Sequence, residues 1–187
     1  VSCDDSGEVV LAARQLGVMH PPGYPLYMLL GALAVRLPLG SPAFRMSLLA
    51  AGLAAAAACL LYTLWRRSAP GHAAFGWAAC GFAALAVGSW SQATTAKGGV
   101  YGLNAVLALG ALASSWRPGS AGAAGLAAGL AWANHWMSAA GVMPALALAA
   151  ARDGRRAGLL SAGGALLGLS VYAALPLAAG HRPFLDW

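Results

Sequence analysis

The stretch Cys3-Asp4-Asp5-Ser6-Gly7-Glu8, with Gly17-Val18-Met19-His20-Pro21-Pro22-Gly23-Tyr24-Pro25-Leu26-Tyr27 after it, is the polar part of this 187-residue sequence. It contains three of the five carboxylates and three of the ten prolines. The remaining sequence consists mostly of Ala, Leu, Gly and Val. We expect this segment to form a polar mouth that an otherwise apolar helical protein holds at a membrane surface.

The composition predicts an all-α polytopic membrane protein. Hydrophobic residues make up 60% of the chain and charged residues 9%, and the mean hydropathy is +0.69. A soluble domain is typically about 25% charged, because water must wet its surface. The net charge of +6 therefore serves more simply to orient the chain in a bilayer than to bind nucleic acid, which we do not expect as a partner.

The chain begins at Val1 and ends at Asp186-Trp187, so we expect a fragment of a longer protein. The three cysteines, Cys3, Cys59 and Cys80, are far apart and show no metal-binding spacing. Cys59 and Cys80 lie in apolar runs, which favours a packing role for both.

Residues 1–42 are expected to form the first extracytoplasmic loop. An acidic start followed by spaced apolar residues predicts a short amphipathic helix within residues 1–20, which Pro21-Pro22-Gly23 ends. Residues 24–37 are apolar, but an apolar run of about 10–14 residues is more often interfacial than spanning. We therefore predict a juxtamembrane helix there.

Residues 43–187 are expected to form a transmembrane bundle of about six spans. Three of its glycines, Gly122, Gly125 and Gly129, have a spacing that favours close contact between helices. The expected spans are 43–64, 72–90, 100–116, two short helices within 120–151 on either side of Asn134-His135-Trp136, and 157–178.

The loop charges predict the orientation. If the helices alternate, six arginines share one side, which the positive-inside rule makes cytoplasmic: Arg66, Arg67, Arg117, Arg152, Arg155 and Arg156. Five cations, Arg14, Arg36, Arg45, Lys97 and Arg182, would then lie outside with the acidic segment. If residues 24–37 crossed the membrane instead, Asp4 and Asp5 would move to the cytoplasm.

Elimination narrows the choice of a general base. Asp153 lies in an arginine-rich loop, where ion pairing explains it, so the carboxylates expected outside are Asp4, Asp5, Glu8 and Asp186. A partly desolvated carboxylate near an acceptor hydroxyl suits that work. The alternative is that the acidic residues only cap a helix and stay solvated.

The other polar candidates have ordinary alternatives too. His20 can be a turn residue that packs on Tyr24 or Tyr27, His135 can satisfy backbone groups at a helix break, and Lys97 can be an interfacial cation. A metal held by His20, His135 and His181 with Asp5 is a weak hypothesis, because these residues show no local ligand spacing. The need for a divalent metal stays open.

Several motifs resemble a membrane-protein family. Asp5-Ser6-Gly7-Glu8 and the block from Leu16 to Tyr27 are similar to the start of the family catalogued as domain of unknown function 2723, which includes transmembrane protein 260. Further similar motifs follow in the same order along the chain. They are Trp90-Ser91-Gln92-Ala93, Val100-Tyr101-Gly102-Leu103-Asn104, Gly129-Leu130 with Asn134-His135, Tyr172-Ala173-Ala174-Leu175-Pro176-Leu177, Pro183, and Asp186-Trp187.

The resemblance implies a GT-C glycosyltransferase related to protein O-mannosyltransferases. It would transfer mannose or a similar hexose from a polyprenyl phosphate to an acceptor, which is a protein or a glycan. An acidic residue of the first extracytoplasmic loop acts as base in such enzymes, and it maps here to Asp5, with Glu8 or Asp4 next in order. His20, Lys97, His135 and Arg182 are expected to contact the donor phosphate or substrate, together with Tyr24, Gln92, Tyr101 and Asn104.

Two departures from the family pattern concern substrate binding. The family usually carries a Glu before Val100-Tyr101, where this chain has Lys97-Gly98-Gly99 with two extra residues. After Leu175-Pro176-Leu177 the family often has an Arg, where this chain has Ala178-Ala179, which leaves Arg182 as a substitute. The resemblance also implies that the first transmembrane helix and a C-terminal part are missing here.

Two other functions remain open at this level. Broken helices with polar turns also fit a transporter or flippase-like carrier, and a non-catalytic membrane subunit would make Asp5 dispensable. The Ala- and Arg-rich, Lys-poor composition suggests a bacterial inner membrane.

Overall fold

The computed structural model describes residues 5–181 and 183. Helices make up most of the described part of the chain, and no strand occurs in it. The α-helices are α1 (Ser6–Gln15), α2 (Pro25–Ala34), α3 (Pro42–Ser68), α4 (Ala73–Leu85), α5 (Val87–Thr94), α6 (Gly98–Ser115), α7 (Ala121–His135), α8 (Met143–Leu169) and α9 (Ala174–Gly180). Short 3-10 helices occupy Pro70–His72, Ser138–Val142 and Ser170–Ala173. The all-α prediction is confirmed.

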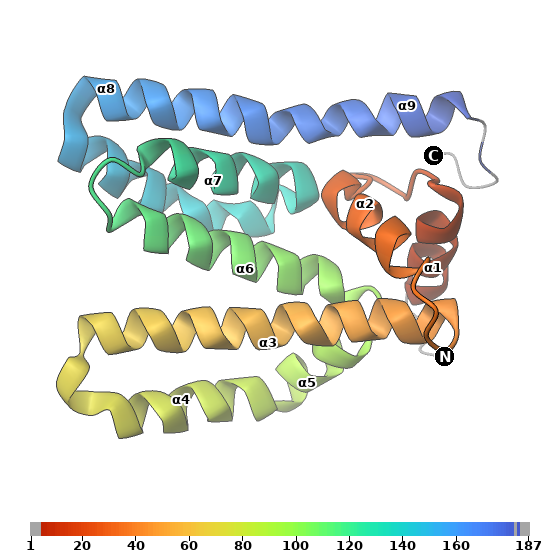
Figure 1. Cartoon of the computed structure of the whole chain (residues 1–187), viewed down its shortest axis with the longest axis horizontal. Coiled ribbons are helices and arrows are strands. Elements are labelled where there is room, and N and C mark those ends of the chain that lie inside the picture. Colours follow the sequence, from red (N-terminus) through yellow and green to blue (C-terminus); the bar gives the residue numbers. More distant parts are fainter. Residues whose placement is uncertain (1–4, 182, 184–187) are drawn as a thin grey trace.

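The long helices run side by side, and they give the molecule two different ends (Figure 1). The connections from α3 to α4 and from α6 to α7, and the break within α8, lie at one end. The helices α1, α2 and α9 and the connection from α5 to α6 lie at the other end (Figure 1). The arginines of the three predicted short loops therefore share one end, while the acidic segment lies at the opposite end.

Three helical segments are long and apolar enough to cross a membrane: Pro42–Ser68, Gly98–Ser115 and Gly154–Gly180. The pair Pro70–Leu85 and Val87–Thr94 passes the same test together, which makes up to four spans among the described residues. The expected count of about six also includes α7 and the apolar segment Ala139–Arg152, which are shorter. Length and composition thus support a polytopic membrane protein.

The expected span 72–90 is not one straight helix. Its two halves, α4 and α5, meet at Ala86 with a bend of 61°, and the backbone of Ala86 is extended there, with φ −57° and ψ 140°. No proline stands at the bend, but Gly88-Ser89 follows it within two residues, and a Gly/Ser pair is one of the usual local signals of a kink. The shorter α5 packs against α3 and α6.

Both predicted N-terminal helices are present, and the second, α2, is shorter than the predicted range 24–37. α2 has 10 residues, which is about 15 Å of helix and half of a hydrocarbon core of about 30 Å. Its position at the end of the bundle agrees with a juxtamembrane helix (Figure 1). Fully buried side chains of α1, α2 and α3, among them Val9, Tyr27 and Met46, form one hydrophobic core with Val100 of α6.

Arg45 fixes the connection between α2 and α3. Its guanidinium donates to the carbonyl of Val35, where α2 ends, and to those of Leu39 and Gly40 in the connection. Carbonyls at the end of a helix have no partner within the helix and need one from elsewhere. This cation, expected on the same side as the acidic segment, therefore has a structural role.

The glycine spacing predicted close helix contact, and α7 and the second half of α8 show it. A Cβ on Gly125 or Gly129 would fall inside van der Waals contact with the carbonyl oxygens of Ser161 and Ala165. Backbones that approach this closely need small residues at the interface. Gly122 has room for a Cβ, because its nearest neighbour atom is 3.7 Å away.

We predict that Gly129→Ala destabilises the protein, because the added methyl group must push α8 away. Overpacking of this kind costs about 1–3 kcal/mol. Gly163→Ala is the matched control, because Gly163 lies on exposed α8 surface and its Cβ would meet nothing within 4 Å. Thermal unfolding in detergent should separate the two variants. Equal melting temperatures would contradict the close packing of α7 on α8.

Candidate active site

Asp5 lies at the start of α1 and forms an ion pair with Lys97. The Lys97 Nζ donates to Asp5 Oδ2, and the Lys97 backbone N–H donates to Ser6 Oγ at 3.3 Å. Asp5 occupies the N-cap position of α1, but its side chain makes no capping hydrogen bond. The capping alternative is therefore wrong for Asp5. The Asp5 side chain is 43% exposed, so its carboxylate can reach a substrate. The Lys97 side chain is only 20% exposed.

Glu8, one turn further along α1, binds His20 through both carboxylate oxygens. The His20 backbone N–H donates to Glu8 Oε1 at 2.8 Å, and His20 Nδ1 lies 2.7 Å from Glu8 Oε2. The Glu8 side chain is 17% exposed. Because Glu8 contacts both the backbone and the ring of His20, it fixes the position and the ring orientation of this histidine.

The other ring nitrogen of His20 faces the rest of the site. His20 Nε2 lies 3.9 Å from Asp5 Oδ2 and 3.3 Å from the Tyr24 hydroxyl. The block after Pro21 makes this possible, because Gly23 has φ 84° and Tyr24 has φ 45°. A left-handed conformation is costly for an aromatic residue and is found most often at functional sites.

An aromatic stack continues the site toward α6 and α7. The rings of Tyr24 and His135 are stacked, with centroids 5.7 Å apart and an angle of 12° between their planes. Tyr101 makes a T-shaped contact with His135 at a centroid distance of 5.4 Å. Burial lowers the pKa of His135 and Lys97 lowers it further, while a hydrogen bond with the backbone acts in the opposite direction. Burial also raises the pKa of the Tyr24 phenol, with further contributions from Tyr101 and Glu8.

The His135 pKa predicts how stability changes with pH. Because its pKa is lower in the folded protein, the unfolded chain binds more protons below the ordinary value of about 6.5. Stability from neutral His135 is thus present above about pH 6.5 and is lost as the pH falls. We expect His135→Phe, which keeps an aromatic ring, to reduce the loss of melting temperature between pH 7.5 and 5.5. An unchanged slope would contradict the lowered pKa of the half-buried His135.

Two buried amides join the site to the bundle. Asn134 Oδ1 accepts the backbone N–H of Tyr27 at 3.2 Å, and Asn134 Nδ2 donates to the Val100 carbonyl and to Asn104 Oδ1. Tyr27 stands in the first turn of α2, whose N-cap Tyr24 provides no side-chain cap. Asn134 therefore caps a helix 107 positions away in sequence. The sequence pattern indicates Asn134 only as part of a helix break.

Asn104, like Asn134, is a buried amide that bonds within the bundle. It is 3% exposed, and its amide donates to the carbonyls of Ala131 and His135 at 3.2 and 3.0 Å. These bonds join α6 to α7, and a contact of Asn104 with substrate stays a prediction.

Close backbone approach explains the glycines after Lys97. A Cβ on Gly99 would overlap the Tyr27 hydroxyl, which donates to the Ala96 carbonyl at 2.7 Å. A Cβ on Gly98 would overlap the carbonyl oxygen of Gln92. Gly98 and Gly99 thus let the chain turn tightly next to Lys97, whose ammonium contacts Asp5.

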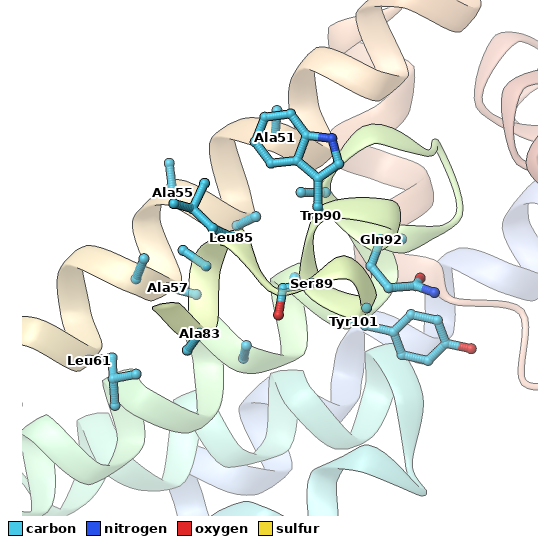
Figure 2. A pocket seen from close by; sticks show the side chains of 18 of the residues that line it. Ala51, Ala55, Ala57, Leu61, Ala83, Leu85, Ser89, Trp90, Gln92 and Tyr101 are labelled. Atoms are coloured by element: carbon cyan, nitrogen blue, oxygen red, sulfur yellow. The ribbon is translucent and has the colours of Figure 1, made fainter. Parts of the chain in front are cut away.

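Three candidates remain: Gln92, Asp4 and Arg182. Gln92 is exposed on α5 and lines a groove with Tyr101 (Figure 2). Asp4 and Arg182 lie outside the described residues, as do Cys3, Asp186 and Trp187. Within the described residues, no three His, Cys, Asp or Glu side chains gather to hold a metal.

The fold and the site together define an integral membrane protein of helical type that carries a charged cluster at one end of its bundle. Residues 5–155 match the family model of the protein O-mannosyl-transferase TMEM260 N-terminal domain. The chain belongs to this family, which confirms the resemblance found in the sequence. The match contains Asp5, Glu8, His20, Lys97 and His135.

Two curated relatives agree with this result. The protein O-mannosyl-transferase TMEM260 of Mus musculus is 45% identical over 102 residues, which cover 54% of this chain and 14% of the relative. The protein O-mannosyl-transferase tmem260 of Dictyostelium discoideum is 58% identical over 31 residues, which cover 17% of this chain and 4% of the relative. The chain thus spans a small part of the curated relatives. No solved structure matches it.

Proposed function

We propose that this chain forms the catalytic N-terminal part of a GT-C type membrane glycosyltransferase. The enzyme transfers mannose from a polyprenyl phosphate to a Ser or Thr hydroxyl of an exported protein. The observation that supports the proposal is the charged cluster at one end of the apolar bundle. It consists of Asp5, Lys97, Glu8 and His20, and the side chains of Lys97, Glu8 and His20 are less than one-third exposed. The names of both curated relatives support mannose as the sugar and a protein as the acceptor.

Asp5 is the proposed base. It is the most exposed carboxylate of the cluster, and it makes no capping bond that substrate binding would have to break. In the resting protein Lys97 neutralises it. When the acceptor hydroxyl takes the place of Lys97 beside Asp5, the ammonium is free to turn toward the phosphate that leaves the sugar. A cation at that point stabilises the negative charge that develops on the leaving phosphate.

Glu8 and His20 position the donor side of the site. The two bonds from Glu8 direct His20 Nε2 toward Asp5 and Tyr24, so the imidazole lies where a sugar or phosphate oxygen would enter. A direct displacement at the anomeric carbon by the acceptor oxygen breaks the bond to phosphate and inverts the anomeric centre. Asp5 takes the acceptor proton, and the polyprenyl phosphate leaves as the anion.

We propose that the site faces the extracytoplasmic side. The arginine-rich connections lie at the opposite end of the bundle (Figure 1), and arginine-rich short loops favour the cytoplasm. Cysteine accessibility at introduced Ser6→Cys and Gly154→Cys, which lie in the α1 end and at the break in α8, would check this. Labelling of both from the same side of sealed vesicles would contradict the orientation.

The donor class is tested with the complete protein in proteoliposomes. We expect radiolabelled mannose to move from polyprenyl-phosphate mannose to a Ser/Thr-containing acceptor peptide, and not from a nucleotide-linked mannose. Mass spectrometry of the peptide identifies the modified hydroxyl. Transport of the lipid-linked sugar without a peptide product, or transfer only from the nucleotide donor, would overturn the proposal.

A further inference from the structure

A groove of about 620 Å³ lies beside the candidate site, between α3, the bent pair of α4 and α5, and α6. This volume is in the range of sites that bind organic ligands. Most of its lining consists of alanines, glycines and leucines, and it extends along α3 from Ala51 to Leu61 (Figure 2). Ten residues of helix correspond to about 15 Å. The groove is therefore long and apolar.

The polar lining residues are not spread evenly along the groove. Gln92 and Tyr101 lie together at one end, whereas Leu61 and Ala57 lie at the other end (Figure 2). Ser89 lies between them. The groove thus has an apolar length and a polar end, which is the pattern of a lipid with a polar head.

The polar end continues into the candidate site. Gly98 lines the groove and follows Lys97 directly in the chain. Tyr101 also lines the groove, and its ring contacts His135, which stacks on Tyr24. A head group at this end would therefore meet the cation Lys97, while its tail would lie along the alanines of α3.

We propose that the groove binds the prenyl chain of a polyprenyl phosphate, with the phosphate directed toward Lys97. This inference rests on the proposed function and adds the place where the donor tail lies. The bend at Ala86 gives the groove its wall, because α5 turns back to α3 and α6. A transmembrane helix of a partner would fit the apolar part, but it would leave the polar end and the adjacent cation unused.

The test uses the complete wild-type protein in nanodiscs and a polyprenyl phosphate that carries a photoreactive diazirine in its tail. We expect the probe to label peptides of α3, α5 and α6. Excess unlabelled polyprenyl phosphate should abolish this labelling, and the same excess of phosphatidylglycerol should not. Labelling elsewhere in the protein, or equal competition by both lipids, would overturn the proposal, because the second result describes an ordinary lipid-facing surface.

A matched pair of variants on α3 adds a kinetic readout. Ala58 lines the groove, whereas Ala56 is exposed outside it. Ala58→Phe should displace about two methylene groups of the tail and raise the KM for a long-chain donor about tenfold. It should leave the KM for a donor of two isoprene units unchanged, and Ala56→Phe should change neither value. Equal effects of Ala58→Phe on both donors would overturn the proposal.

The two proposals fail differently. If the diazirine probe labels the groove but no mannose reaches a peptide, the proposed function is wrong and the lipid site stands. If mannose is transferred but the probe labels other helices, the function stands and the groove assignment is wrong. The wild-type labelling does not depend on whether Ala58→Phe folds.

Discussion

The Asp5→Asn variant should lose almost all mannosyl transfer, with kcat reduced about 10³-fold. An amide cannot accept the acceptor proton, and general base catalysis typically contributes about 10²–10⁴-fold. The substitution keeps the shape of the side chain, and the Asp5 side chain is 43% exposed. An exposed ion pair contributes about 0–1 kcal/mol, so the variant should fold. Initial rates with a saturating acceptor peptide measure the effect.

Two further variants serve as comparisons for Asp5→Asn. Arg14→Gln changes an exposed charge on the same helix, so it should leave kcat within about twofold, since surface substitutions away from a site have small effects. Glu8→Gln should affect donor binding more than kcat, because Glu8 acts through His20. Wild-type kcat in Asp5→Asn would show that another group is the base.

The Asn134→Leu variant should lower the free energy of unfolding more than any other substitution proposed for this protein. It removes the acceptor of the Tyr27 N–H and the donor to Asn104, and both groups are buried. Each buried polar group without a partner costs about 1–3 kcal/mol. A total of about 3 kcal/mol lowers the melting temperature by roughly 6–12 °C for a domain of this size. Thermal unfolding of the purified protein measures this shift.

Gln15→Leu is the matched control, because it is a similar loss of an amide at an exposed position on α1. It should change the melting temperature by no more than about 2 °C. Asn134→Leu should also lower transfer, because α2 carries the Tyr27 anchor and lies next to Tyr24. If both variants unfold at the same temperature, the long-range cap of α2 by Asn134 does not hold in the membrane protein.

Much of the fold could be predicted because each helix has its own local signal. Ser41 and Pro42 begin α3, and Arg66 and Arg67 lie in its last turn, which agrees with the predicted span 43–64. The apolar run over 72–90 predicts a straight span and thus misses the bend at Ala86, although the nearby Gly88-Ser89 pair is a local signal of a kink. The packing of α5 on α3 and α6 becomes visible only in the folded chain. The same applies to the exact extent of α2.

The candidate site could be predicted in part. The acidic segment, His20 and Lys97 stood out because charged residues are rare in an apolar chain, and the structure brings them together. Their pairing could not be predicted, since Asp5 and Lys97 are separated by 92 positions. Asn134 looked like part of a helix break, and only its contacts with Tyr27 and Asn104 identify it as a cap.

The most direct test of the central claim separates donor binding from the chemical step in a single turnover. The complete protein, as wild type and as Asp5→Asn, is loaded with radiolabelled polyprenyl-phosphate mannose, freed of unbound donor and mixed with the acceptor peptide. We predict that both proteins retain the donor and that only the wild type transfers mannose to the peptide. Transfer by Asp5→Asn at the wild-type rate would contradict the assignment of this cluster as the catalytic centre with Asp5 as its base.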